Sequence, residues 1–259
     1  PFNLSFGAEL AYVFGGIDNN VLNRRDDVQL ATQQITKSNV KGTSVKLGIH
    51  YAPRIKDELR VKFGLATDLE STLKERGDVQ VYSIVNDDNS LGIPVDTLQS
   101  YDYTSTIISP LKTAISAGIG EDNKWFVGAE YTFHNPIEFS GGIYDDVSFY
   151  RYGDFSNISV GGFFTPNMNS ISNYFNRVTY RAGFNYQKTG LIVNETEINE
   201  YGISFGVSLP MGLKLSNVNL GFELGKRGTT DNNLVEEKFF NFRMSLSLND
   251  KWFRKQKIY

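Results

Sequence analysis

The sequence alternates between large apolar residues and small or polar residues along most of its length. In the segment 200–210, EYGISFGVSLP, the odd positions are Tyr, Ile, Phe, Val and Leu, whereas the even positions from 202 to 208 are only glycine and serine. A period of two predicts β-strands, because successive side chains of a strand point to opposite faces. The pattern therefore predicts an all-β chain.

The same alternation recurs ten times, and each recurrence predicts one strand. The predicted strands cover residues 2–14, 43–51, 59–65, 111–119, 125–133, 158–164, 178–186, 201–209, 218–224 and 240–248. Most of them approach the roughly 9–11 residues that a tilted strand needs to cross a bilayer, whereas strands of soluble proteins average about 5–6. Strand length therefore favours a transmembrane antiparallel β-barrel.

The connections between the predicted strands alternate in length. Long connections cover 15–42, 70–110 and 135–155, short ones include PRIKDE and EDNK, and the segment PNMNSISNYFNR is intermediate. Outer-membrane barrels have short turns at the periplasmic rim and long loops at the outer rim. Ten strands then place the start of the first strand and the end of the last at the periplasmic rim.

Two parts of the long connections also have recognisable patterns. The stretches GDVQVYSIV (77–85) and LQSYDYTSTII (98–108) predict strands that protrude above the membrane or form loop hairpins. The stretch 19–35, NNVLNRRDDVQLATQQI, predicts a short helix. The chain contains no linker-like run of Pro or Ser, so we expect residues 1–259 to form a single transmembrane domain.

The apolar face of a membrane barrel points outward, and aromatic residues collect where strands meet the two interfaces. Aromatic residues stand near strand ends at positions 12, 14, 51, 125, 131, 133, 186, 201 and 252. The opposite face would line the lumen, with these candidates: Lys46, His50, Arg60, Lys62, Glu130, His134, Arg181, Glu223 and Arg243. A water-soluble barrel would instead put its many Phe and Tyr side chains inside and overfill its interior.

Three groups among these candidates each allow two interpretations. Glu223 and Arg243 are expected on adjacent strands, as a selectivity element or as a structural ion pair. Glu130 and His134 could respond to protons, because histidine titrates near neutral pH, or could simply be polar lumen residues. The third group, Lys46, Arg60 and Lys62, could attract an anionic head group or pair with the nearby residue Glu9.

Composition narrows the functional classes. The net charge of −3 gives no basic stripe for nucleic acid, and the absence of Cys removes disulfides, thiolate catalysis and Cys-based zinc sites. The two histidines are far apart in sequence, so no metal site is expected. No hydrolase, P-loop or dinucleotide motif is present, so we expect neither an enzyme nor a cofactor.

The segments NRVTYRAGFNYQKTGL, INEYGISFGVSLPMG and SNVNLGFELGKRGTT resemble outer-membrane proteins of Bacteroidota that are similar to the FadL family. The resemblance implies a fourteen-stranded barrel with an N-terminal plug, so that about four strands and the plug would precede Pro1. It implies passive transport of hydrophobic small molecules across the bacterial outer membrane. The alternative is an accessory or structural subunit of an outer-membrane secretion or protein-assembly complex. The expected partners are lipid bilayer, lipopolysaccharide and a hydrophobic ligand or detergent.

Overall fold

The computed structural model describes residues 3–25, 28–56, 58–85, 94–142, 150–211 and 216–248. These residues form one antiparallel sheet of fourteen strands, together with two short 3₁₀ turns, η2 (Tyr174–Arg177) and η3 (Asp231–Asn233). The all-β prediction is confirmed. No helix in the described ranges has the length and hydrophobicity to cross a bilayer.

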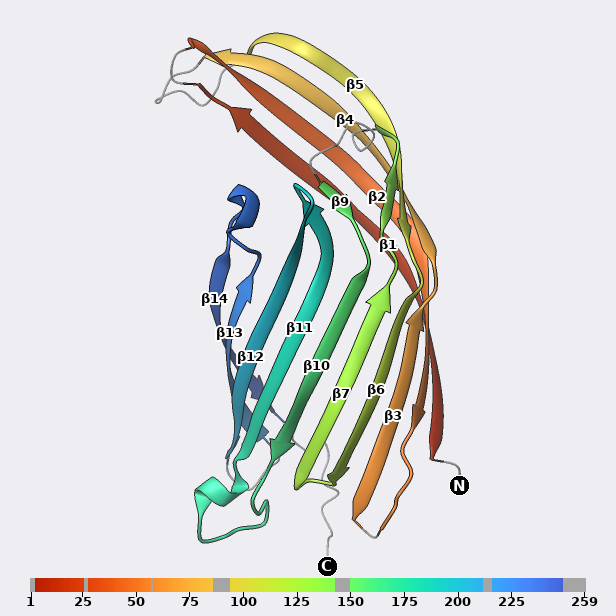
Figure 1. The fold of residues 1–259 in the computed structure, drawn as a ribbon, viewed down its shortest axis with the longest axis vertical. Coiled ribbons are helices and arrows are strands. Elements are labelled where there is room, and N and C mark those ends of the chain that lie inside the picture. Colours follow the sequence, from red (N-terminus) through yellow and green to blue (C-terminus); the bar gives the residue numbers. More distant parts are fainter. Residues whose placement is uncertain are drawn as a thin grey trace, which may run out of the picture.

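Ten strands form a curved wall in which each strand pairs with the next one along the wall (Figure 1). Their bounds are β1 Leu4–Asn23, β2 Leu30–Tyr51, β3 Leu59–Asp68, β6 Lys112–Glu121, β7 Trp125–His134, β10 Phe155–Phe164, β11 Thr179–Val193, β12 Thr196–Met211, β13 Ser216–Arg227 and β14 Glu237–Ser247. Each of the ten predicted strands corresponds to one of these. The wall strands run alternately up and down, but the connections do not all keep the predicted alternation of length: residues 165–178 join β10 to β11 at the rim of the short turns, whereas only residues 194–195 join β11 to β12 at the opposite rim.

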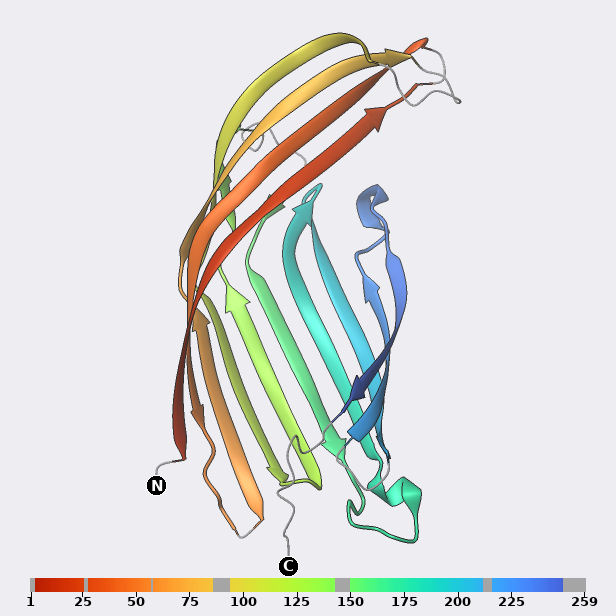
Figure 2. The same cartoon turned by 180° about the vertical axis from the view of Figure 1, so that it is seen from behind.

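The wall continues beyond one rim as a curved extension. It consists of the upper halves of β1 and β2 with the hairpin of β4 (Ser71–Val85) and β5 (Pro94–Ser109), and it arches over the end of the wall (Figures 1 and 2). The protruding strands predicted in 77–85 and 98–108 are therefore confirmed. Two short strands, β8 (Glu138–Ser140) and β9 (Tyr150–Tyr152), pair with β5 and β11.

The short helix predicted within 19–35 is wrong in the described part of that stretch. Strand β1 runs on to Asn23, and β2 begins at Leu30. The residue Ile35 shows the reason: it pairs with Asn20 on one side and with Gln80 on the other. Sheet hydrogen bonding with two neighbours overrides the weak helix propensity of the segment.

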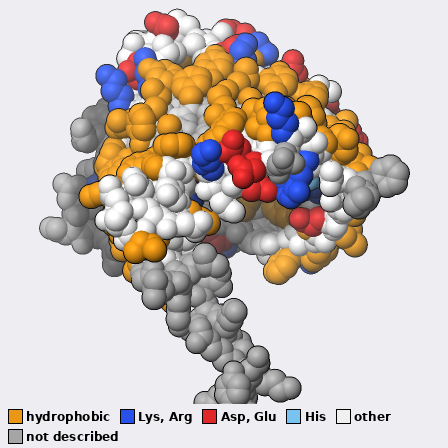
Figure 3. All heavy atoms as spheres, turned by 90° about the horizontal axis from the view of Figure 1, so that it is seen from below, with side chains coloured by type: hydrophobic (Ala, Val, Ile, Leu, Met, Phe, Trp, Pro, Cys, Tyr) orange, Lys and Arg blue, Asp and Glu red, His pale blue; other side chains and the backbone are white. Residues whose placement is uncertain are grey.

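The two faces of the wall differ in composition as the alternation predicts. Large apolar side chains of the outer face are exposed, for example Leu10 at 78% and Phe205 at 57%. Seen from below, hydrophobic side chains surround a group of charged ones (Figure 3). Burying this band requires lipid, since an apolar surface of this extent is unfavourable in water.

Aromatic residues mark two levels of the outer face. Register places Tyr131, Tyr186 and Tyr201 at one level and Trp125, Phe164 and Tyr180 at a lower one. The levels are six residues apart along β7, about 20 Å of strand. With strands tilted by about 35–45°, this length spans roughly 14–16 Å along the membrane normal, so both levels fit within the apolar band of about 25 Å in membrane barrels. The aromatic residue expected at position 252 lies outside the described residues.

Candidate functional site

Strand pairing arranges the inner-face residues in level rows across the wall. The middle row crosses six neighbouring strands, from β3 to β12, and contains Lys62, Gly118, Gly128, Gly161, Gly183 and Ser204. Four of these six residues are glycine; the Phe126 ring covers Gly118 and Gly128, and the backbone is bare of side chains at Gly161. A ligand can therefore approach the main chain closely here.

The rows above and below differ in chemistry. Toward the extension the neighbouring row is polar and contains His50, Gly64, Ser116, Glu130, Ser159 and Asn185. Toward the short turns the neighbouring row contains Arg60, Gly120, Phe126, Phe163, Arg181 and Gly206. The glycine-rich middle row thus separates a polar row from a row with aromatic rings.

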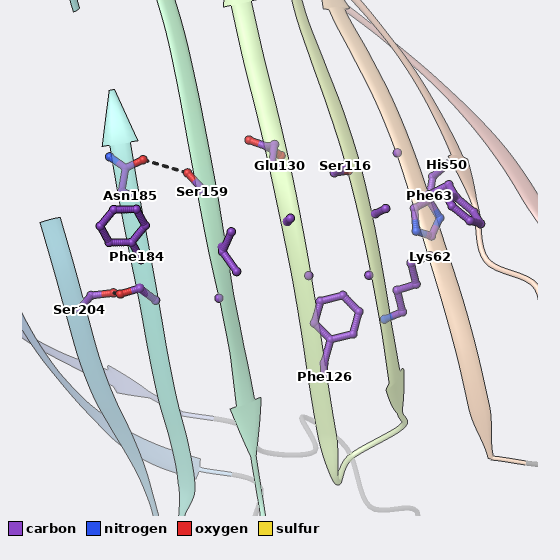
Figure 4. Close-up of a pocket in the computed structure, with 18 residues that line it drawn as sticks. His50, Lys62, Phe63, Ser116, Phe126, Glu130, Ser159, Phe184, Asn185 and Ser204 are labelled. Atoms are coloured by element: carbon purple, nitrogen blue, oxygen red, sulfur yellow. Dashed lines mark hydrogen bonds between the residues drawn. The ribbon is translucent and has the colours of Figure 1, made fainter. Parts of the chain in front are cut away.

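An open cavity of about 550 Å³ lies on the inner wall, lined by the middle row, by the polar row and by Phe126 from the third row (Figure 4). Its volume lies within the roughly 300–1,000 Å³ of small-molecule sites. Phe126 stacks with Phe163 at a ring-centre distance of 6.3 Å. A Cβ atom at Gly118 would lie only 2.3 Å from the Phe126 ring, so this glycine makes room for the ring.

The three predicted basic residues have three different contacts. The Lys46 ammonium lies 3.2 Å from the Asp68 carboxylate, and the Arg60 guanidinium lies 2.9 Å from that of Asp122. The ammonium of Lys62 lies 5.2 Å from the centre of the Phe126 ring, within the range of a cation–π interaction. Glu9 is directly opposite Lys46 in the register, but the ion pair described for Lys46 is with Asp68.

The other predicted inner-face residues are divided between the cavity and its surroundings. Glu130 lies in the cavity, together with His50 and Lys62 (Figure 4). His134 lines a different pocket, where its Nδ1 is 2.6 Å from the carbonyl oxygen of Asn135 and its ring stacks on Phe155. The structure therefore does not bring Glu130 and His134 into one cavity.

Glu223 and Arg243 contact each other between β13 and β14, as the sequence predicts. The Arg243 guanidinium is 3.5 Å from a Glu223 carboxylate oxygen, which also accepts a hydrogen bond of 3.2 Å from Asn241. Arg181 donates a hydrogen bond of 2.6 Å to the hydroxyl of Ser208, which donates in turn to Asn219. These contacts tie β11, β12, β13 and β14 together below the cavity.

The sequence reasoning missed Phe126, an inward-facing ring that lines the cavity, and Phe163, which stacks on that ring from outside the cavity lining. Each stands beside a second aromatic residue, in Trp125-Phe126 and in Phe163-Phe164. Neighbouring residues of a strand point to opposite faces, so one ring of each pair must point inward. That signal was available in the sequence. In the described part of the chain, no group of three or more His, Asp or Glu side chains is arranged to hold a metal ion.

A curved antiparallel wall with an apolar outer face and a polar inner face defines a protein of the β-barrel class. The BamG family model matches residues 2–259, and the chain belongs to the BamG family. No curated protein matches the sequence.

Two solved structures share the fold. The CymD monoaromatic hydrocarbon channel is 15% identical with a TM-score of 0.52, and the match covers 87% of this chain and 65% of CymD. The toluene transporter TodX of Pseudomonas putida is also 15% identical with a TM-score of 0.52, over 86% of this chain and 60% of TodX. At this identity the likeness shows the FadL-like fold. The chain spans less than two thirds of either protein.

Proposed function

We propose that this protein is a barrel of the bacterial outer membrane that lets hydrophobic small molecules cross passively. The cavity on the inner wall carries the proposal, because it offers the aromatic ring of Phe126, backed by Phe163, inside a wall whose outer face is apolar. The two structural neighbours are named as a hydrocarbon channel and a toluene transporter, which supports it. An origin in Bacteroidota, contact with lipopolysaccharide and a place as the C-terminal part of a longer barrel belong to the same proposal.

The test fills the cavity from within. Ser159 points into it, whereas its neighbour Ile158 is on the outer face and 45% exposed. In cells that carry the full-length gene, uptake of radiolabelled toluene should fall several-fold in Ser159→Trp. It should stay near the wild-type rate in Ile158→Trp at matched protein levels. Equal uptake in the deletion strain and the wild type would contradict transport.

A second candidate is an accessory barrel subunit of an outer-membrane secretion or protein-assembly complex. The observation that favours it is the pairing of charges across the inner wall, in Lys46–Asp68, Arg60–Asp122 and Arg243–Glu223. Ion pairs of this kind are expected in a barrel whose interior is filled by its own side chains and that serves as a structural subunit. Purification of the tagged full-length protein from native membranes decides between the two candidates, since a subunit must retain defined partners in stoichiometric amounts and a separate channel must not.

A further inference from the structure

The inner-wall cavity has a polar side and an apolar side. On the polar side Glu130 lies between Ser116 and Ser159, which are its register partners on β6 and β10. On the apolar side the ring of Phe126 lies four residues closer to the short turns than Glu130 on the same strand (Figure 4). Phe163 stacks on this ring from outside the cavity lining. Gly128 and Gly161 separate the two sides and add no side chains; the Phe126 ring lies over Gly128, and Gly161 stays uncovered by side chains. The cavity therefore has the shape and chemistry to take an amphiphile along the strand direction.

Glu130 differs from the other carboxylates of this part of the inner wall. Asp68, Asp122 and Glu223 each form an ion pair with a basic residue. Glu130 is exposed to the cavity and has no ion pair or hydrogen bond with any residue that the structure describes. A carboxylate beside a low-dielectric wall gains most from a partner of opposite charge.

The two basic groups of the cavity do not fill this role. Lys62 lies on β3, two strands from Glu130, and its ammonium is over the face of Phe126. His50 lies on β2, three strands away in the same row. The space next to the Glu130 carboxylate is left for a group that the ligand brings.

We propose that this cavity selects amphiphiles with a cationic head group, and that Glu130 is the residue that recognises this group. The ammonium binds the carboxylate and donates to the hydroxyls of Ser116 and Ser159. The alkyl or aryl part lies along Gly161 and contacts the ring of Phe126. The inference rests on the proposed function and names the substrate class of the same site.

The test compares three probes that share a dodecyl chain and differ only in their head group: dodecylammonium, dodecanol and dodecanoate. Their affinities for the full-length protein in lipid nanodiscs are measured by calorimetry against empty nanodiscs. Dodecylammonium should bind about tenfold more tightly than dodecanol, the size expected for a hydrogen bond to a charged group. Glu130→Gln should remove this preference. Glu223→Gln, which changes a paired carboxylate of the same face, should keep it.

The outcomes separate the inference from the proposed function. Binding of all three probes with equal affinity, or tightest binding of dodecanoate, overturns the role of Glu130 and leaves hydrophobic transport standing. A preference for dodecylammonium that survives Glu130→Gln also overturns it. Absence of binding for every probe overturns both.

Discussion

At the scale of single residues, the direction of each side chain decides its role. In strand β12, Phe205 and Ser204 are neighbours, yet Phe205 is part of the apolar outer band and Ser204 lines the inner cavity. Phe205 is level with Phe222 on β13, so the two rings share one depth in the band. The same backbone thus presents hydrocarbon-like chemistry on one side and hydroxyl chemistry on the other.

This alternation predicts unequal effects of a new charge. Phe205→Arg or Leu220→Arg should lower the free energy of unfolding by about 2–4 kcal/mol if these positions lie near the bilayer midplane. Ser204→Arg should cost less, because its guanidinium can reach the polar side of the wall. Equilibrium unfolding of the full-length protein in liposomes measures the difference. Equal losses for the three variants would contradict the assignment of faces.

At the scale of elements, the extension has an interior of its own. The buried residues Val79, Tyr103 and Ser105 lie on one face of the β4–β5 hairpin. The Tyr103 hydroxyl donates a hydrogen bond of 3.1 Å to Glu75, a carboxylate that is only 2% exposed. Burial is the main cause that raises the pKa of Tyr103 above its ordinary value, and the charge of Glu75 raises the pKa further.

The raised pKa of Tyr103 gives the extension a dependence on alkaline pH. A tyrosine whose pKa is higher in the folded state stabilises the fold fully below its unfolded pKa and loses this effect as pH rises through the folded value. Hydrogen exchange of β4 and β5 should therefore speed up as pH rises above 10.0, the ordinary tyrosine pKa. Intrinsic exchange rates must be divided out at each pH.

The variant Tyr103→Phe isolates this effect. The opening free energy derived from its protection factors near neutral pH should fall by about 1–3 kcal/mol, because a buried carboxylate loses a donor. Its loss of protection at alkaline pH should be weaker than that of the wild type. Tyr101→Phe is the control, since Tyr101 lies on the same face of β5 but is 47% exposed. Identical behaviour of the two variants would show that the Tyr103–Glu75 contact does not hold the extension.

At the scale of the whole molecule, the described wall has two edges, β1 and β14, which pair with β2 and β13 on one side only. Unpaired backbone groups cannot face hydrocarbon, because each costs several kcal/mol there. Closure therefore needs additional pairing at both edges. The fourteen-stranded barrel inferred from the family resemblance would supply it and stays a prediction.

A closed barrel of this kind should behave as an integral membrane protein. The full-length chain should partition into the detergent-solubilised outer membrane. It should also migrate differently in gels before and after heating, because a closed sheet resists detergent until it is heated. Recovery of the protein as a soluble periplasmic monomer would contradict the membrane topology.

The sequence by itself determined the strands and their faces. The alternation at Tyr201, Ile203 and Phe205 is local, since the direction of a side chain depends only on its position within its own strand. Connection lengths predicted the two rims less well, because β11 and β12 continue to a two-residue turn at 194–195 where the sequence predicts a longer loop. The Glu223–Arg243 contact could also be predicted, because a single hairpin joins their strands.

Only the tertiary structure decided which residues share a level. Glu130, Phe126 and Lys62 come from β7 and β3, and their meeting in one cavity depends on the register of β3, β6 and β7. Strand pairing also decides that Lys46 contacts Asp68 and not Glu9. It likewise decides that the stretch 19–35 forms strands and not a helix. Register is set by contacts between distant segments, and alternation along one strand carries no information about it.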